Sequence, residues 1–328
     1  MRISNCVMQK RGVIVKKVCL ILLLLVPLLS GCDKRPIVAL CVRQDSSDSW
    51  QANCLRTHLE QSGYLVAMEN AGNDQSRQNR QVEQHLERGC DLLILEPVMA
   101  AATEQLLRQA KDAEVPVILL SGSSAENGPD DYENVYCIGT DLKRVGKTQS
   151  ELIRTLPNGG DINNDGTIMY TVISGPKNYT DTRYRTLGCV AAIDGVCLEV
   201  GYGGWEKEDG VRICQQQISR GGDQLDVILC DGEEITLGAL EALVASEKTV
   251  GENVYLLGLG VDNRVLDEIR NGRLTGLVAP DVQGFTASVV NTADAILAGQ
   301  PQEKMQYNNY VAVTKENVDA YEKAKAVW

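Results

Sequence analysis

From residue 36 onward, short apolar runs alternate with amphipathic stretches every 20 to 30 residues. Several runs are continuous and rich in Val, Ile and Leu, which is typical of strands covered by helices on both faces of a parallel sheet. The pattern predicts ten strands, at residues 37–42, 64–69, 92–96, 115–120, 135–139, 168–174, 197–201, 225–230, 254–259 and 274–279. Helices are expected between them, for example at 50–62, 76–88, 100–113 and 234–246. This βαβ order predicts the α/β class, and so many strands favour two lobes over one wide sheet.

In such sheets, ligands bind beyond the carboxyl ends of the strands. The segments at those ends carry acids, amides, one arginine and aromatic rings, but no nucleophile–base pair and no phosphate-binding glycine loop. Gly258-Leu259-Gly260 lacks the third glycine of a dinucleotide fingerprint. The candidate segments are 45–50, 96–99, 121–124, 175–185, 231–234, 260–262 and 280–283.

Length and charge narrow the classes of function. The chain has 328 residues, of which 44% are hydrophobic and 23% charged, as in a globular protein of about two domains. The formal net charge is −12, and residues 1–31 hold five basic side chains and no acid, so the remainder carries −17. An acidic body of this kind argues against nucleic-acid binding.

The N-terminus has the features of an export signal. Basic residues up to Lys17 precede an apolar run at 18–29, which is too short for a comfortable membrane span. The run ends in Leu29-Ser30-Gly31-Cys32, which looks like a bacterial lipobox. Cleavage before Cys32 would leave a lipidated N-terminus that tethers an exported protein to a membrane. The alternative is an ordinary signal peptide with an incidental cysteine.

Cysteine and histidine do not predict a metal or redox centre. Eight of the eleven cysteines lie beyond Cys32, and no C-x-x-C occurs. Export would permit disulfides, but Cys41, Cys137 and Cys230 fall inside apolar runs, so we expect most of the eight to be small buried hydrophobes. The two histidines, His58 and His85, lie in helical patterns, and we expect both at surface or half-buried positions.

The segment D-I-N-N-D-G-T-I predicts a calcium loop. Asp161, Asn163 and Asp165 alternate, and Gly166 follows for the sharp turn, so that oxygen ligands and the carbonyl of Thr167 could surround one ion. The twelfth position, where an EF-hand has glutamate, is Val172. A final carboxylate would therefore come from elsewhere. A solvated acidic turn is the alternative.

Two of the three tryptophans, Trp50 and Trp205, fall at predicted strand ends. An aromatic ring can stack on the C–H face of a sugar while planar polar groups bind its hydroxyls. The alternative for each tryptophan is a rim or core position.

The segment N-D-Q-S-R-Q-N-R-Q at 73–81, taken with the calcium-type loop, resembles the galactose/glucose-binding proteins of ABC sugar importers. The similarity covers nearly all of the mature chain, including I-G-T-D at 138–141 and L-G-A-L-E-A-L at 237–243. The resemblance implies a type I periplasmic-binding-protein fold, with two Rossmann-like lobes joined by a three-crossover hinge. It places the crossovers near 140–142, 279–282 and 309–311. The expected parts are a signal at 1–31, an N-terminal lobe at 32–141 plus 281–310, and a C-terminal lobe at 142–280 plus 311–328.

The resemblance also implies site residues. In the N-terminal lobe these are Asp48, Trp50 and Glu96, and in the C-terminal lobe Tyr179, Asp181, Arg185, Trp205 and Asp262. Asp231 and Asp281 are further candidates at strand ends, since Asp281 follows Pro280, where the family has Asn. Calcium ligands fall on Asp161, Asn163, Asp165, Thr167, Met169 and Asp226.

Departures from the family pattern affect specificity. Met169 stands where the family has Gln, and Asp226 is shorter than the family's Glu, so calcium binding is expected to be weaker. Glu96 replaces Asn, Tyr179 replaces His, and Gly232 replaces Asn. The extra acid suggests that the sugar bears a cation, as an amino sugar does.

The resemblance implies capture of a monosaccharide by hinge closure and delivery to an ABC permease. A sugar sensor for a chemoreceptor or histidine kinase is the alternative. A repressor of this fold would need a basic DNA-binding head where the lipobox stands. An enzyme would need a carboxyl group with a raised pKa among acids such as Asp48, Glu96 and Asp181. Spacing alone does not show one, and we expect no enzyme.

Overall fold

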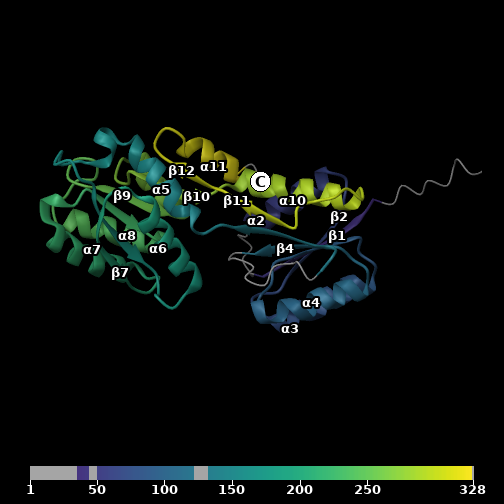
Figure 1. The fold of residues 1–328 in the computed structure, drawn as a ribbon. Coiled ribbons are helices and arrows are strands. Elements are labelled where there is room, and N and C mark those ends of the chain that lie inside the picture. Colours follow the sequence, from purple (N-terminus) through teal and green to yellow (C-terminus); the bar gives the residue numbers. More distant parts are fainter. Residues whose placement is uncertain (1–34, 44–49, 122–131, 327–328) are drawn as a thin grey trace, which may run out of the picture. The chain divides into compact units, whose positions relative to one another are not determined.

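Two six-stranded sheets organise the chain (Figure 1). The structure is a computed structural model that describes residues 35–43, 50–121 and 132–326. The first sheet has the order β11-β5-β4-β3-β1-β2, and its strands are β1 (Ile37–Val42), β2 (Leu65–Asn70), β3 (Leu92–Leu95), β4 (Val117–Ser121), β5 (Val135–Thr140) and β11 (Met305–Asn308). The second has the order β12-β10-β9-β8-β6-β7, and its strands are β6 (Met169–Ser174), β7 (Val196–Tyr202), β8 (Val227–Cys230), β9 (Tyr255–Leu259), β10 (Gly276–Pro280) and β12 (Tyr310–Val313). All pairings between these strands are parallel except that of β10 with β12.

Helices cover both faces of the first sheet, as its continuous apolar strands require. Alternate residues of a strand point to opposite faces, so Leu40 packs toward α2 and α10 while Cys41 packs toward α3 and α4. Figure 1 shows these two helix pairs on opposite sides of the strands. Their bounds are α2 (Trp50–Gln61), α3 (Gln75–Glu87), α4 (Ala100–Asp112) and α10 (Val282–Leu297).

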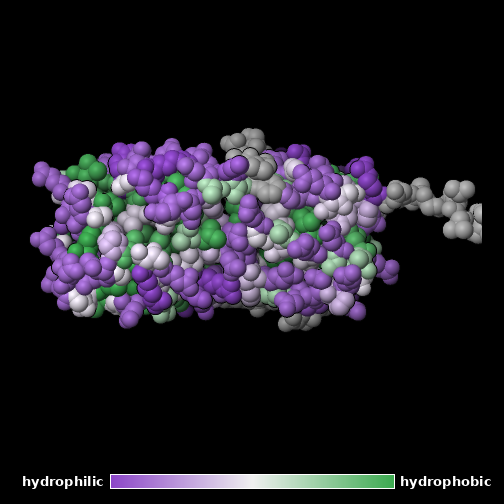
Figure 2. Space-filling view, turned by 90° about the horizontal axis from the view of Figure 1, so that it is seen from above, coloured by the Kyte–Doolittle hydropathy of each residue, from purple (hydrophilic) through white to green (hydrophobic). Residues whose placement is uncertain are grey.

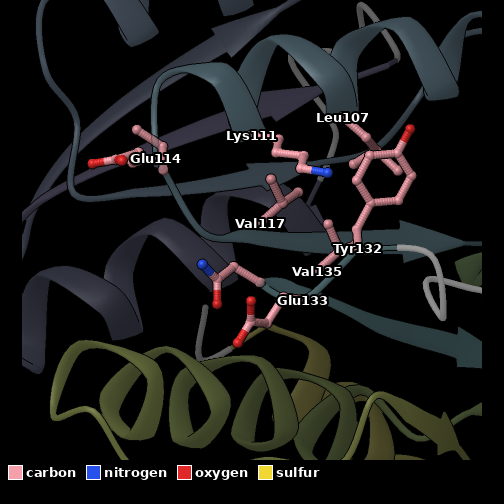
Figure 3. Close-up of a pocket in the computed structure, with 9 residues that line it drawn as sticks. Leu107, Lys111, Glu114, Val117, Tyr132, Glu133 and Val135 are labelled. Carbon is pink, nitrogen blue, oxygen red and sulfur yellow. The ribbon is translucent and has the colours of Figure 1, made fainter.

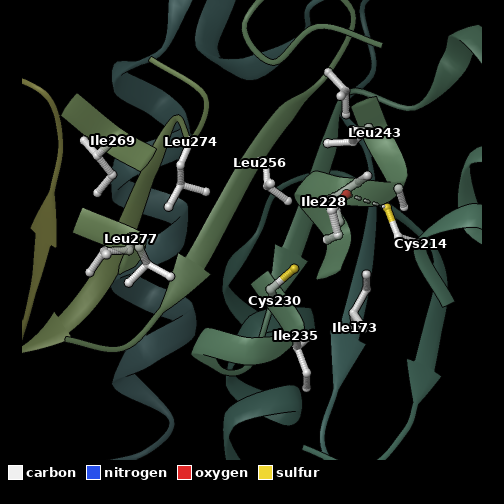
Figure 4. Close-up of a cluster of buried hydrophobic side chains, with 14 of the residues drawn as sticks. Ile173, Cys214, Ile228, Cys230, Ile235, Leu243, Leu256, Ile269, Leu274 and Leu277 are labelled. Carbon is white, nitrogen blue, oxygen red and sulfur yellow. Dashed lines mark hydrogen bonds between the residues drawn. The ribbon is translucent and has the colours of Figure 1, made fainter. Parts of the chain in front are cut away.

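The second sheet is covered in the same way. Ile228 and Leu256 pack under α7, α8 and α9, while Val227 and Leu257 face α5 and α6. Figure 4 shows the first of these clusters, in which Leu256 and Ile228 lie between the strands and the helices. Each such side chain contributes about 1.5–3 kcal/mol when fully buried. The helices are α5 (Arg144–Thr155), α6 (Thr180–Ala192), α7 (Lys207–Gly221), α8 (Glu233–Ala245), α9 (Asn263–Arg270) and α11 (Val318–Ala326), with 3-10 turns η3 (Pro157–Gly160) and η4 (Gly222–Gln224).

The chain passes between the sheets three times: after β5, between β10 and α10, and at Asn309 between β11 and β12. The predicted α/β fold with two lobes and three crossovers is therefore confirmed. All ten predicted strands are present, with ends displaced by a residue or two. Two strands, β11 and β12, were not predicted. They are four residues each, and a single residue separates them, so neither forms an apolar run long enough to stand out.

The expectation for His85 is wrong. Its side chain is buried, because Gln78, Val82 and His85 share the inner face of α3. Its Nε2 lies 3.5 Å from Oε1 of Glu69. His58 is half-buried, as expected.

The eight cysteines that the structure describes are free thiols, and all are buried except the half-buried Cys197. Cys41, Cys137 and Cys230 lie inside the two cores, as predicted. Burial raises the pKa of Cys137 to about 11, which disfavours the reactive thiolate.

Polar side chains dominate the surface drawn in Figure 2, and hydrophobic residues form smaller areas between them. No helix among the described residues is both long and apolar enough to cross a membrane.

Candidate functional site

Arg185 of α6 and Asp231, directly after β8, form a buried ion pair at the carboxyl ends of the second sheet. Nε of Arg185 lies 2.5 Å from Oδ1 of Asp231, and Nη2 donates to Oδ2 at 3.5 Å. The hydroxyl of Ser174, the last residue of β6, lies 3.3 Å from Oδ2 and 2.7 Å from Oγ1 of Thr186. Burial raises the pKa of Asp231, and the guanidinium acts in the opposite direction. These contacts hold Arg185 in one orientation.

The indole of Trp205 lies beside this pair. Cζ of Arg185 is 5.6 Å from the centroid of the ring, and the ring of Tyr179 meets it edge-on with centroids 6.5 Å apart at 89°. The indole packs over two glycines: a Cβ at Gly175 would overlap Cη2, and a Cβ at Gly232 would lie 3.4 Å from Cε3. The second sheet thus brings two rings and a fixed guanidinium to one place.

The packing of Trp205 makes Gly175→Ala disruptive. The added methyl must displace the indole, and we expect a loss of about 1–3 kcal/mol in unfolding free energy, as in other overpacked sites. The matched control is Gly232→Ala, where the backbone is extended at φ 176° and the new contact is an ordinary one. We expect that control within about 0.5 kcal/mol of the wild type. Urea denaturation followed by tryptophan fluorescence measures both, and equal stability of the two variants would contradict this packing.

Asp262 lies at the end of β9, where the sequence predicts it, but its carboxylate is already engaged. It caps α9 by accepting the N–H of Arg264 at 2.7 Å, and it pairs with Nη2 of the same arginine at 2.7 Å. Arg264 also reaches Glu234, with Nη2 2.5 Å from Oε1. The side-chain hydrogen bond from Arg264 lowers the pKa of Asp262 below its usual range.

In the first lobe, Glu96 follows β3 and pairs with Arg43. Oε2 of Glu96 accepts the N–H of Arg43 at 3.2 Å, and Oε1 lies 3.5 Å from its Nη2. Gln78 supports this segment from α3, because its Nε2 donates to the carbonyl of Glu96 at 2.8 Å and its Oε1 accepts the N–H of Val98 at 2.9 Å. The 73–81 segment therefore braces the loop after β3. Asp281 caps α10 by accepting the N–H of Gly284 at 2.9 Å.

One residue near the cluster was missed by sequence reasoning. Tyr310, on the unpredicted strand β12, is close enough to Asp181 and Asp231 for their charges to act on it. Burial, aided by these carboxylates and opposed by Arg185, raises the pKa of Tyr310 to about 12. In the sequence, only the crossover predicted at 309–311 indicated a position near the site for Tyr310.

Two predicted residues of the first lobe cannot be placed. Asp48 lies outside the described residues, and of Trp50 only the backbone, at the start of α2, is described. The resemblance implies that Trp50 and Trp205 are stacking rings on opposite sides of one sugar, and this stays a prediction.

The Asp161–Gly166 turn is closed by its own hydrogen bonds. Oδ1 and Oδ2 of Asp161 accept the N–H groups of Asp165 at 3.2 Å and Gly166 at 2.8 Å. Oδ1 of Asn163 accepts the same N–H of Asp165 at 2.8 Å, and Oδ1 of Asp165 accepts that of Thr167 at 2.9 Å. Gly166 has a φ of 89°, a conformation that favours glycine.

Asp226 binds both ends of this loop through backbone amides. It is fully buried, and its Oδ1 accepts the N–H groups of Ile162 at 3.0 Å and Asn163 at 3.3 Å. Its Oδ2 accepts the N–H of Met169 at 2.7 Å. Both oxygens of this carboxylate therefore already have partners.

Calcium takes roughly six to eight oxygen ligands. Met169 offers only a thioether. The side-chain oxygens of Asp161, Asn163 and Asp165 accept backbone N–H groups, as those of Asp226 do. These three residues are less buried than Asp226, so they and the carbonyl of Thr167 fit an ion best. No group of three or more His, Cys, Asp or Glu side chains within the described parts of the chain is placed to hold a metal.

A groove of about 340 Å³ lies elsewhere, at the amino ends of β4 and β5. Figure 3 shows Lys111 and Tyr132 on its wall, with Nζ of Lys111 5.9 Å from the ring centroid of Tyr132. It shares no residue with the candidate site, which lies at the opposite strand ends.

Comparisons with known proteins agree with the two-lobed α/β fold. The family model described as "Periplasmic binding protein domain" matches residues 38–301. The D-galactose/methyl-galactoside binding periplasmic protein MglB of Haemophilus influenzae is 26% identical over 274 residues, which cover 78% of this chain and 82% of that protein. The xylitol-binding protein of Mycolicibacterium smegmatis is 24% identical over 267 residues, covering 80% and 72%. An ABC transporter solute binding protein from Bacillus halodurans, solved with bound myo-inositol, shares the fold with a TM-score of 0.65 at 22% identity, covering 90% of this chain and all of that one.

Proposed function

We infer that this chain, which belongs to the periplasmic binding protein domain family, captures a neutral monosaccharide and presents it to an ABC permease. The observation that carries the inference is the arrangement of Trp205, Tyr179 and the Arg185–Asp231 pair at one edge of the second sheet. Rings suit the C–H face of a sugar, and a fixed guanidinium suits its hydroxyls. A relative named for galactose supports this class of ligand, and one named for xylitol, an uncharged polyol, supports a neutral ligand rich in hydroxyls. We propose binding without turnover, as the names of these relatives suggest.

The charges favour an uncharged, galactose- or glucose-like sugar over an amino sugar. Three of the candidate acids already have basic partners: Glu96 has Arg43, Asp231 has Arg185, and Asp262 has Arg264. The negative charge that suggested a cationic sugar is therefore largely neutralised by arginines of the protein itself.

Hinge closure is the proposed mechanism. We place the lobes at 32–141 plus 281–310 and at 142–280 plus 311–328, joined by the three crossovers. Sugar would shift the equilibrium toward the closed form by its higher affinity for that form. The permease would then recognise the closed form.

The crossovers are linked by side chains. The guanidinium of Arg144 bonds to the side chain of Asn309 and lies 3.6 Å from Oδ2 of Asp141. Nδ2 of Asn308 donates to the carbonyl of Asp281 at 3.1 Å. These contacts join all three hinge segments, so the segments can act together.

Two further proposals concern anchoring and calcium. We propose that the mature protein is exported and tethered by lipid on Cys32, which lies outside the described residues. The support is the basic start and the apolar run at 18–29.

We also propose weak, structural calcium binding by Asp161, Asn163, Asp165 and the carbonyl of Thr167. Bound calcium would neutralise charge on this loop without taking part in sugar binding.

A panel of sugars tests the function. Titration calorimetry of the mature protein with galactose, glucose, ribose, xylitol and glucosamine is expected to show micromolar or tighter binding of a neutral member. Glucosamine is expected to bind at least about tenfold more weakly than glucose, a difference of about 1.4 kcal/mol. Tighter binding of glucosamine would overturn the neutral-sugar proposal, and no binding by any member would overturn monosaccharide capture.

A further inference from the structure

The turn that carries Asp262, between β9 and α9, is held from two sides by charged residues of distant segments. On one side is Glu233, the first residue of α8. Its Oε1 accepts the N–H of Val261 at 2.7 Å and that of Asp262 at 3.1 Å. Gly260, at φ +142°, has no room for a Cβ, because the Glu233 side chain packs against it. Glu233 therefore fixes the backbone directly before and at Asp262.

On the other side is Lys325, near the end of α11. Its Nζ donates to the carbonyl of Val261 at 2.6 Å and to Oδ1 of Asn263 at 2.6 Å. Glu233 and Lys325 thus bind the N–H and the C=O of the same residue, Val261. Their opposite charges also act on each other: burial lowers the pKa of Lys325, and Glu322, Asp262 and Glu233 oppose that effect.

The helix that presents Lys325 is itself fixed to α9. Nε of Arg270 lies 2.7 Å from Oδ1 of Asp319, and the same guanidinium bonds to Glu322. Asp319 and Glu322 lie on α11, about two turns and one turn before Lys325 respectively. The position of the ammonium group is therefore set by contacts away from the turn.

We propose that Glu233 and Lys325 are positioning residues for Asp262, so that sugar affinity depends on the C-terminal helix although this helix does not carry the ligand residues. The inference rests on the proposed function, together with the sequence prediction that Asp262, at the end of β9, belongs to the sugar-binding residues. Loss of either residue leaves the turn held from one side only, and Asp262 then spends less time in the geometry that the ligand requires.

The main test is Lys325→Met, which keeps the apolar stem and removes the charge and donors. We expect about tenfold weaker binding of the best sugar of the panel by calorimetry. Lys323→Met, an exposed lysine of the same helix, is the matched control and is expected to bind as the wild type does. Lys325→Arg keeps the charge and is expected to recover part of the affinity. Unchanged affinity of Lys325→Met would overturn the proposal.

A double-mutant cycle separates positioning from general stability. If Lys325 acts through Asp262, Lys325→Met has little further effect on affinity in an Asp262→Asn protein. Equal losses in both backgrounds would show that Lys325 acts otherwise and would overturn the proposal. Glu233→Gln supplies a second variant, should Lys325→Met fail to fold, and is expected to weaken binding in the same Asp262-dependent way.

Amide hydrogen exchange gives a readout without ligand. Exchange at Val261 and Asp262 is expected to be at least tenfold faster in Lys325→Met than in Lys323→Met. A wild type that binds no sugar of the panel refutes the proposed function, and the exchange rates then still decide whether the turn is held as described. A wild type that binds sugar, with unchanged exchange in Lys325→Met, refutes only the positioning role.

Discussion

Arg185→Met is expected to abolish measurable sugar binding and to lower the unfolding free energy by about 3–5 kcal/mol. The substitution removes the partner of Asp231, whose carboxylate is buried and would remain without a compensating charge. It also removes the guanidinium that lies by Trp205. Urea denaturation measures the loss of unfolding free energy, and calorimetry with the best sugar measures the loss of binding.

Two variants control this experiment. Arg183→Met changes an exposed arginine on the same helix and is expected to alter neither quantity by more than about 0.5 kcal/mol. The double variant Arg185→Met with Asp231→Leu removes both charges and is expected to regain stability without regaining binding. If Arg185→Met binds sugar as well as Arg183→Met does, the second-lobe site is wrongly placed.

Asp226→Ala is expected to lower the unfolding free energy by about 3–5 kcal/mol, because three loop amides lose their buried acceptor. Asp226→Asn keeps one acceptor oxygen and is expected to cost less. Asp223→Asn, at an exposed position three residues away, is the control and is expected to match the wild type. Thermal or urea unfolding measures all three, and an Asp226→Ala protein as stable as the control would refute the role of the carboxylate as a clamp.

The same unfolding experiment, repeated with calcium and with chelator, tests the proposed calcium site. Since Asp226 already joins both ends of the loop, chelator is expected to lower the wild-type melting temperature by only a few degrees and to leave sugar affinity unchanged. Asp161→Asn is expected to remove that response. A melting temperature identical with calcium and with chelator would exclude the proposed weak site, whereas unfolding on chelation would show that calcium, and not Asp226, holds the loop.

The positions of the strands could be predicted from the sequence because most are covered on both faces and therefore read as unbroken apolar runs. β11 could not, since Gln306 and the half-exposed Tyr307 interrupt it and its place at the sheet edge is set by pairing with β5. His85 was misjudged for a related reason. Its burial depends on which face of α3 meets the sheet, and a polar residue on that face gives no apolar signal.

The candidate site could be predicted in part. The rule that ligands bind at strand ends finds Arg185, Trp205 and Asp231 without coordinates. It does not show that Asp262 is already bound by Arg264, or that Asp226 accepts three backbone N–H groups of the loop. Pairings of this kind join residues that are distant in sequence or depend on side-chain direction, so composition and spacing carry no information about them.

Neither sheet is built from one continuous piece of the chain, and this connectivity determines when a newly made chain can fold. The first five strands leave the ribosome long before α10, which supplies part of the cover of one face, and β11, which is the sixth strand. Until about residue 308 has been made, the apolar face that Phe285 and Val289 cover stays open and the edge of β5 stays unpaired. Contacts between such distant segments form slowly. The same order of strands that builds the finished hinge therefore delays completion of the first sheet until late in synthesis.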